Sequence, residues 1–193
     1  TLATEFPDLD LYHPWSISAE EAVRLATRME AAAFDVSPLI TNSEGASVNV
    51  GDGHFMAANS LGFKGGYPYS RHSIGCAPIA GSGQRMQRDD WYSSSCSPQR
   101  LADPEAVGRY AAQRALSRLD SRTLSTRKVP VLFEAPLACG LLGHLVQATS
   151  GSALYRKSTF LVDSLGQQVM APHIDIVEDP EIPAESGSSA FDS

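Results

Sequence analysis

Apolar residues recur with a helical period in two segments of the chain. After Ser18 they return every three or four positions as far as Ala33, and Ser18 with Glu21 has the spacing of a capping box. This pattern predicts a helix over residues 19–33. A second helix is predicted after Asp103-Pro104-Glu105, because aspartate caps a helix, proline suits its first turn and glutamate favours the positive end of its dipole.

A period of two follows the first of these segments and predicts a β-rich region. Residues 46–50 alternate, Gly-Asp-Gly at 51–53 predicts a turn, and 54–58 is the expected returning strand. Residues 62–69 are rich in glycine and aromatic residues and are expected to form a loop. Two further strands are expected, and their positions are 71–80 and 90–96. The pattern therefore predicts an α+β fold, with an antiparallel sheet of about four strands flanked by helices.

The periodic pattern ends in the polar stretch 120–128, where we place a domain boundary. We expect a central domain over residues 1–124, the start of a second domain over 125–179, and a flexible tail over 180–193, where prolines and a Gly/Ser cluster gather. In the second domain an apolar strand at 129–134 is expected to lead into a helix at about 137–148.

Charge and composition narrow the possible functions. The net charge of −7 and the pI of about 5.1 argue against general affinity for nucleic acid, because phosphates would be repelled. No apolar run approaches the ~20 residues that span a bilayer. The chain has three cysteines, which are widely spaced and suggest no disulfide framework; this favours a reducing, cytoplasmic location. Because the chain begins at Thr1, we expect a fragment or a processed product.

The sequence offers few candidates for chemistry. None of the five histidines has zinc-ligand spacing. His72, beside Arg71 and Ser73, is a candidate base and a candidate contact to a peptide or partner, and the plain alternative is a structural histidine in a strand. Arg156 stands where a phosphate loop would need its second glycine, which argues against a nucleotide site. Arg156 and Lys157 are instead candidate contacts to a peptide carboxylate or an acidic partner, or else part of a solvated loop.

Short motifs spread along nearly the whole chain resemble a known family. They include DLYHPW at 10–15, TNSEGAS at 41–47, NSLGF at 59–63, KVPVLFEAP at 128–136 and LYRKS at 154–158. In this order the motifs resemble the PmbA/TldD family, whose members are considerably longer than this chain. The resemblance implies a two-subunit cytoplasmic peptidase, a heterodimer that degrades unfolded peptides or processes them during peptide maturation.

The resemblance also implies which subunit carries the metal. In this family the zinc-bearing TldD-type subunit has an H-E-x-x-x-H motif and a further cysteine ligand. Carried onto this chain, the three motif positions fall at Gly143, His144 and Ala148, which do not restore the motif. We therefore expect no catalytic residue, metal site or cofactor in this chain, and zinc in the partner subunit.

Three functions stay open at this point. The first is a non-catalytic subunit that pairs with a TldD-type subunit and helps to enclose an unfolded peptide by offering a strand edge. The second is a regulatory binding protein without proteolysis, since family members were once named gyrase modulators. The third is an independent hydrolase with a site around His72.

Overall fold

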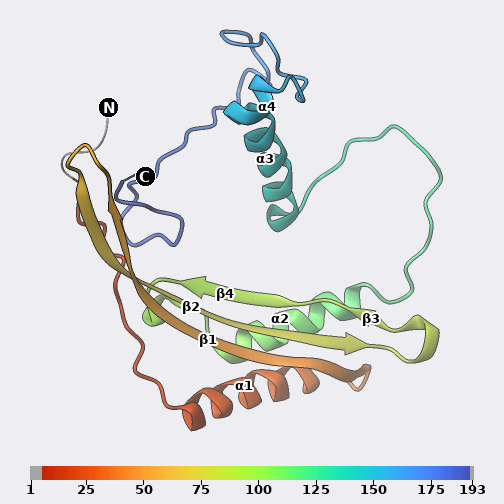
Figure 1. The fold of residues 1–193 in the computed structure, drawn as a ribbon. Coiled ribbons are helices and arrows are strands. Elements are labelled where there is room, and N and C mark those ends of the chain that lie inside the picture. Colours follow the sequence, from red (N-terminus) through yellow and green to blue (C-terminus); the bar gives the residue numbers. More distant parts are fainter. Residues whose placement is uncertain (1–5, 192–193) are drawn as a thin grey trace. The chain divides into compact units, whose positions relative to one another are not determined.

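The computed structural model describes residues 6–191. The chain forms two compact units, of which the first comprises Thr1–Arg122 with Asp179–Ser193 and the second comprises Thr123–Glu178. Figure 1 shows their helices and strands.

Two capped helices belong to the first unit. Helix α1 spans Ala19–Phe34 and begins with the predicted capping box, in which Glu21 N donates to Ser18 Oγ at 3.2 Å and Ser18 N donates to Glu21 Oε2 at 2.9 Å. Helix α2 spans Pro104–Ser117, and Asp103 Oδ2 accepts from Ala106 N at 2.8 Å. Both predicted helices are confirmed. They could be predicted because each cap is formed by residues that are close together in the sequence.

The sheet is antiparallel and confirms the predicted fold class. Strand β1 (Ile40–Ala58) pairs along its whole length with β2 (Lys64–Ala80), which pairs on its other side with the short strands β3 (Gln87–Arg88) and β4 (Trp91–Ser95). Two short 3₁₀ turns, Gly83–Arg85 and Pro98–Arg100, lie on either side of β3 and β4. Strand β1 therefore forms one edge of the sheet.

The hairpin turns at a different place from the predicted one. The register runs through Gly51 opposite Arg71 and Gly53 opposite Tyr69, so the expected turn at 51–53 is wrong. The chain reverses at residues 59–63, where Asn59 Oδ1 accepts from the backbone N–H groups of Leu61 and Phe63. The expected loop at 62–69 is also wrong, because β2 begins at Lys64. A turn signal at 51–53 is overridden where pairing with a distant segment continues the ladder.

The main core lies between the sheet and the two helices. Side chains from β2, such as Ile74 and Cys76, pack against Met29 of α1 and Val107 of α2, and all four are buried. Figure 1 shows α1 and α2 on one face of the sheet, while the far part of the β1–β2 hairpin extends past them. Side chains in that part of the hairpin need other partners.

A second apolar cluster supplies partners at the far part of the hairpin. Leu9 and Leu11 from the start of the chain are buried there with Ala190 and Phe191 from its end. The ring of Phe191 lies 4.8–5.6 Å, between centroids, from the rings of Phe6, Phe55, Phe63 and Tyr67. The sequence predicts a flexible tail over 180–193, whereas the described part of this segment is anchored to the first unit by an aromatic side chain.

The second unit is built from helices and loops. Helix α3 (Ala135–Thr149) confirms the predicted helix, and the short helix α4 (Gly151–Tyr155) follows it. The predicted strand at 129–134 is wrong, because no described strand pairs with this segment and a strand needs a partner. Within residues 6–191, the helices are all too short or too polar to cross a membrane.

Candidate functional site

The positions of the missing zinc motif lie on α3 of the second unit. The side chains of Gly143 and Ala148 have no atom that can bind a metal ion, and His144 contributes a single exposed imidazole. Among the described residues, no group of three or more His, Cys, Asp or Glu side chains could hold a metal ion. A zinc site of this kind needs three protein ligands, so the residues at these positions do not fit the ion.

His72 lies in β2 of the first unit and is fully buried. Its Nε2 is 2.8 Å from the carbonyl oxygen of His13, and the ring of Trp15 packs edge-on at 5.6 Å. Arg71 and Ser73 point to the opposite face, because successive side chains of a strand alternate. The structure therefore does not bring His72 together with these two neighbours, and a buried imidazole offers a substrate no access.

Arg156 and Lys157 follow α4 in the second unit, and both are exposed. Arg156 Nε donates to the carbonyl oxygen of Ser152 at 3.4 Å, a local contact at the end of the helix. Their surroundings in the second unit are those of a solvated loop.

The first unit offers a different feature, the outer backbone edge of β1. Residues 46–58 pair with β2 without interruption. On β2, Ser70 N points away from β1 and donates to Leu11 O at 2.9 Å. Because hydrogen-bonding directions alternate along an antiparallel ladder, the backbone groups of residues 48, 50, 52, 54 and 56 point outward from β1. We call this row the open edge, since no described residue hydrogen-bonds to it through its backbone.

The open edge lacks the devices that usually protect sheet edges. Proteins blunt such edges with bulges, prolines or lysines. In β1 the register shifts are confined to the stretch before Ala46, and residues 46–58 contain no lysine or proline. Asp52 is the acidic side chain in this stretch. A regular, unprotected edge of this length is a template for pairing with another extended chain.

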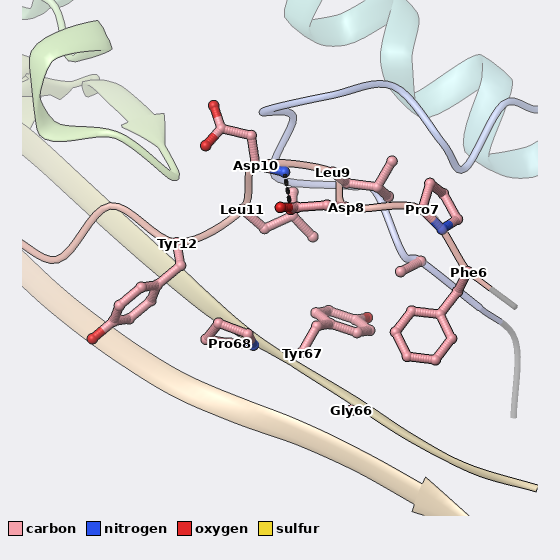
Figure 2. Close-up of a pocket in the computed structure, with 11 residues that line it drawn as sticks. Phe6, Pro7, Asp8, Leu9, Asp10, Leu11, Tyr12, Gly66, Tyr67 and Pro68 are labelled. Atoms are coloured by element: carbon pink, nitrogen blue, oxygen red, sulfur yellow. Dashed lines mark hydrogen bonds between the residues drawn. The ribbon is translucent and has the colours of Figure 1, made fainter.

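The opposite edge of the hairpin is covered. Figure 2 shows residues 6–12 running beside β2 near Gly66, Tyr67 and Pro68. Pro68 has no N–H to offer, and Ser70 is bound by Leu11. A hollow of about 380 Å³ lies between the two segments. The protection of this edge makes the exposure of β1 a specific feature of the hairpin.

The hollow in Figure 2 contains two carboxylates whose roles are local. Asp8 Oδ1 accepts from the backbone N–H of Asp10 at 3.0 Å, drawn as the dashed line. Asp10 has a φ of +52° and its Oδ1 lies 3.3 Å from His13 Nε2. Both groups therefore shape the turn that carries the chain along β2.

The hairpin also has an outer face, which bears Phe55, Tyr67, Tyr69 and Arg71 and lies opposite the face of His72. A Cβ atom on Gly53 would lie 2.8 Å from the hydroxyl oxygen of Tyr69, so the tyrosine ring crosses β1 over this glycine. Between the outer face and residues 185–188 lies a cavity of about 490 Å³, which we call the outer-face cavity.

The sequence suggests a strand edge for an unfolded peptide but does not locate it on β1, and it does not reveal the outer-face cavity. The sequence does contain a signal for the outer-face cavity, which is the spacing of two glycines and two tyrosines. Gly51 and Gly53 share one face of β1, and Tyr67 and Tyr69 share the same face of β2. The chemistry that the open edge and the cavity support is recognition of an extended chain.

Comparisons with known proteins agree in sequence and in fold. The chain matches the model of the PmbA/TldA metallopeptidase central domain over residues 12–119 and that of the C-terminal domain over 126–193. It is 45% identical over 192 residues to "Metalloprotease PmbA" of Escherichia coli O157:H7 and 40% identical to a PmbA homolog of Haemophilus influenzae. All of this chain is covered in both cases, and it spans 43% of each relative.

Two solved structures share the fold. A Bacteroides thetaiotaomicron protein described as a modulator of DNA gyrase superposes with a TM-score of 0.84 at 24% identity, over 99% of this chain and 44% of its own. A Thermotoga maritima protein described in the same way gives a TM-score of 0.78 at 21% identity, over 86% of this chain and 39% of its own. At these identities the likeness concerns the fold alone.

Proposed function

Because the chain belongs to the PmbA/TldA metallopeptidase family, we propose that it is part of the non-catalytic subunit of a two-subunit zinc peptidase. The observation that carries this proposal is the loss of donor atoms at Gly143 and Ala148 of α3. A zinc peptidase cleaves the peptide bond with a water molecule that the metal activates. Because this chain lacks the metal-binding side chains, the zinc is held by a TldD-type partner subunit. The substrate is an unfolded peptide, and the assembly works in the cytoplasm.

The open edge gives this subunit a role in holding the peptide. An extended peptide can add to a sheet edge through its main chain, which requires no particular sequence. The outward N–H and C=O groups of residues 48–56 supply the donors and acceptors for such pairing. This mode of binding suits a peptidase whose substrates are recognised as unfolded chains.

Charge argues against a second copy of the chain as the occupant of the open edge. Asp52 stands at the midpoint of residues 46–58. If two β1 strands paired antiparallel over this full length, the two Asp52 side chains would lie directly opposite each other, and like charges in that position destabilise the pair. A peptide of different sequence avoids this repulsion.

The cysteines are consistent with the proposed location. Cys76 and Cys96 are buried and Cys139 is exposed, and all three are free thiols. Such thiols persist in a reducing compartment.

Reconstitution of the full-length protein with its zinc-bearing partner tests the proposal. We expect no hydrolysis of an unstructured peptide by this subunit alone and hydrolysis by the pair. Turnover by the subunit alone would contradict the proposal, and so would recovery of gyrase in place of a zinc-bearing subunit as the main partner from cells.

The variant Val50→Pro tests the role of the open edge. Val50 N points outward, so proline removes one edge donor without breaking the ladder with β2. We expect peptide affinity to fall about tenfold, as for the loss of roughly one main-chain hydrogen bond and the fit beside it. The control Val50→Ala keeps the N–H and should bind like the parent protein. Equal affinity of the proline variant would exclude the edge as the binding site.

A further inference from the structure

The outer-face cavity brings together donors that suit a carboxylate. Its lining includes Tyr69 and Arg71 from β2, Phe55 from β1, and Ser186 and Ser188 from the segment that covers it. The aromatic side chains form apolar walls, and the Arg71 guanidinium and the Tyr69 hydroxyl supply hydrogen-bond donors. The Ser188 hydroxyl is already engaged, because it donates to the carbonyl oxygen of Ile182 at 2.6 Å. A cavity of about 490 Å³ accommodates a side chain or the terminal residue of a peptide.

The charge of Arg71 is not balanced by a carboxylate among the described residues. One amino group, Nη2, donates to the carbonyl oxygen of Ser186 at 2.6 Å, which leaves the other donors of the guanidinium available. Glu185 also lines the cavity, but Arg100 Nη2 binds its Oε1 at 2.8 Å. The acidic group of the lining is thus compensated, while the basic group keeps its charge for a ligand.

Tyr69 brings a second donor toward the open edge. Its ring crosses β1 above Gly53, where any larger residue would collide with the hydroxyl oxygen. The hydroxyl has no hydrogen-bond partner among the described residues, and the side chain is 42% exposed. A strand added to the open edge would lie about 4.8 Å beyond β1, so that its side chains opposite Gly51 and Gly53 rise beside this hydroxyl.

We propose that the outer-face cavity is a specificity subsite that binds a carboxylate carried by a peptide on the open edge, with Arg71 and Tyr69 as the recognising residues. This inference rests on the proposed function, because it presumes that an extended peptide adds to β1. The main chain of the peptide supplies sequence-independent affinity, and the subsite adds a preference for one acidic position. Either an Asp or Glu side chain or the C-terminal carboxylate would supply the ligand.

Binding of fluorescent peptides to the full-length protein tests the subsite. A set of 12-residue unstructured peptides carries one Glu or one Gln at each alternate position, and each is made with a free and an amidated C-terminus. We expect about fivefold tighter binding with the carboxylate at one position, an effect that weakens at high ionic strength. Dependence on amidation would assign the carboxylate to the C-terminus, and dependence on Glu would assign it to a side chain.

Variants separate recognition from a structural role of the arginine. In Arg71→Gln the preference should fall to about onefold while the Gln peptide binds as before, and in Tyr69→Phe, which keeps the ring, it should fall about twofold. Arg24→Gln, at an exposed position of α1, is the matched control and should keep the full preference. If Arg71→Gln does not fold, Arg71→Lys retains the charge and should show a reduced preference.

The outcomes distinguish this inference from the proposed function. Peptides that bind with no preference for a carboxylate at any position would overturn the subsite and leave the open edge intact. A preference that survives Arg71→Gln would also overturn it, and Arg71 would then only fix residues 184–188. Failure of every peptide to bind would overturn the proposed peptide role and the subsite together.

Discussion

Gly108 sets the distance between the two helices of the first unit, and its replacement by alanine should destabilise the unit. Gly108 is buried in α2. A Cβ atom at this position would lie 2.0 Å from the carbonyl oxygen of Met29 and 3.4 Å from Ala33 N, both in α1. Carbon and oxygen atoms in contact need more than an ångström beyond 2.0 Å, and the atoms in the way belong to backbone. The helices must therefore move apart.

The expected cost combines two opposing effects. Alanine improves helix propensity by about 1 kcal/mol relative to glycine. Overpacking of a filled core costs about 1–3 kcal/mol, and here the upper end applies because the obstructing carbonyl belongs to a helix. Separation of α1 from α2 also weakens the packing of Met29 and Val107. We expect a net loss of about 2 kcal/mol in the free energy of unfolding of the first unit.

Denaturation followed by tryptophan fluorescence measures this effect in the 193-residue chain. Trp15 and Trp91, the two tryptophans, both lie in the first unit and pack against its core. The matched control is Gly143→Ala in α3, where an added Cβ meets no atom within 4 Å; its fluorescence transition should not move. A Gly108→Ala variant as stable as the parent, or more stable, would refute the inferred close approach of the helices.

Two further predictions concern a buried thiol and a helix cap. Burial, with a smaller effect of Glu30, raises the pKa of the Cys76 thiol to about 11 from 9.0. Alkylation of the folded chain at pH 8, measured by mass spectrometry, should therefore modify the exposed Cys139 and spare Cys76. The free energy of unfolding should fall between pH 9 and pH 11, because the Cys76 thiol ionises in that range only in the unfolded state. Labelling of both thiols at the same rate would contradict this burial. Asp103→Ala should lower the free energy of unfolding by about 1 kcal/mol in a denaturant titration, since it removes the cap of α2. Asp103→Asn keeps a side-chain oxygen that can cap the helix, so it should retain most of the stability. Equal losses of stability in the two variants would argue against the cap.

Elements with local signals could be predicted from the sequence. The cap residues Ser18 and Asp103 fix the starts of α1 and α2 through contacts within three positions. The boundary of the hairpin could not be predicted in this way, because continuation of β1 past Gly51 depends on pairing with Arg71, 20 residues further along the chain. The segment 129–134 has a strand-like composition but no described neighbour to pair with, and composition alone does not form a ladder.

The features of the candidate site also differ in whether the sequence alone could predict them. The absence of zinc ligands at Gly143 and Ala148 can be read directly from the residues once the motif is aligned. The open edge cannot, because whether a strand lies at an edge depends on the order of all strands in the sheet. Nor does the sequence show that Tyr69 crosses β1 at Gly53, which requires the register of the hairpin. From the sequence alone, His72 is a candidate catalytic histidine. Only the structure shows that its ring is buried against Trp15, which indicates a structural role.

Zinc content measured together with peptide hydrolysis tests the central claim most directly. The full-length subunit and its reconstituted pair with the zinc-bearing partner would be analysed by elemental mass spectrometry, and each would be assayed on one unstructured peptide. The account predicts no stoichiometric zinc and no turnover in the subunit alone, and about one zinc with turnover in the pair. One tightly bound zinc per isolated subunit, with turnover, would contradict it.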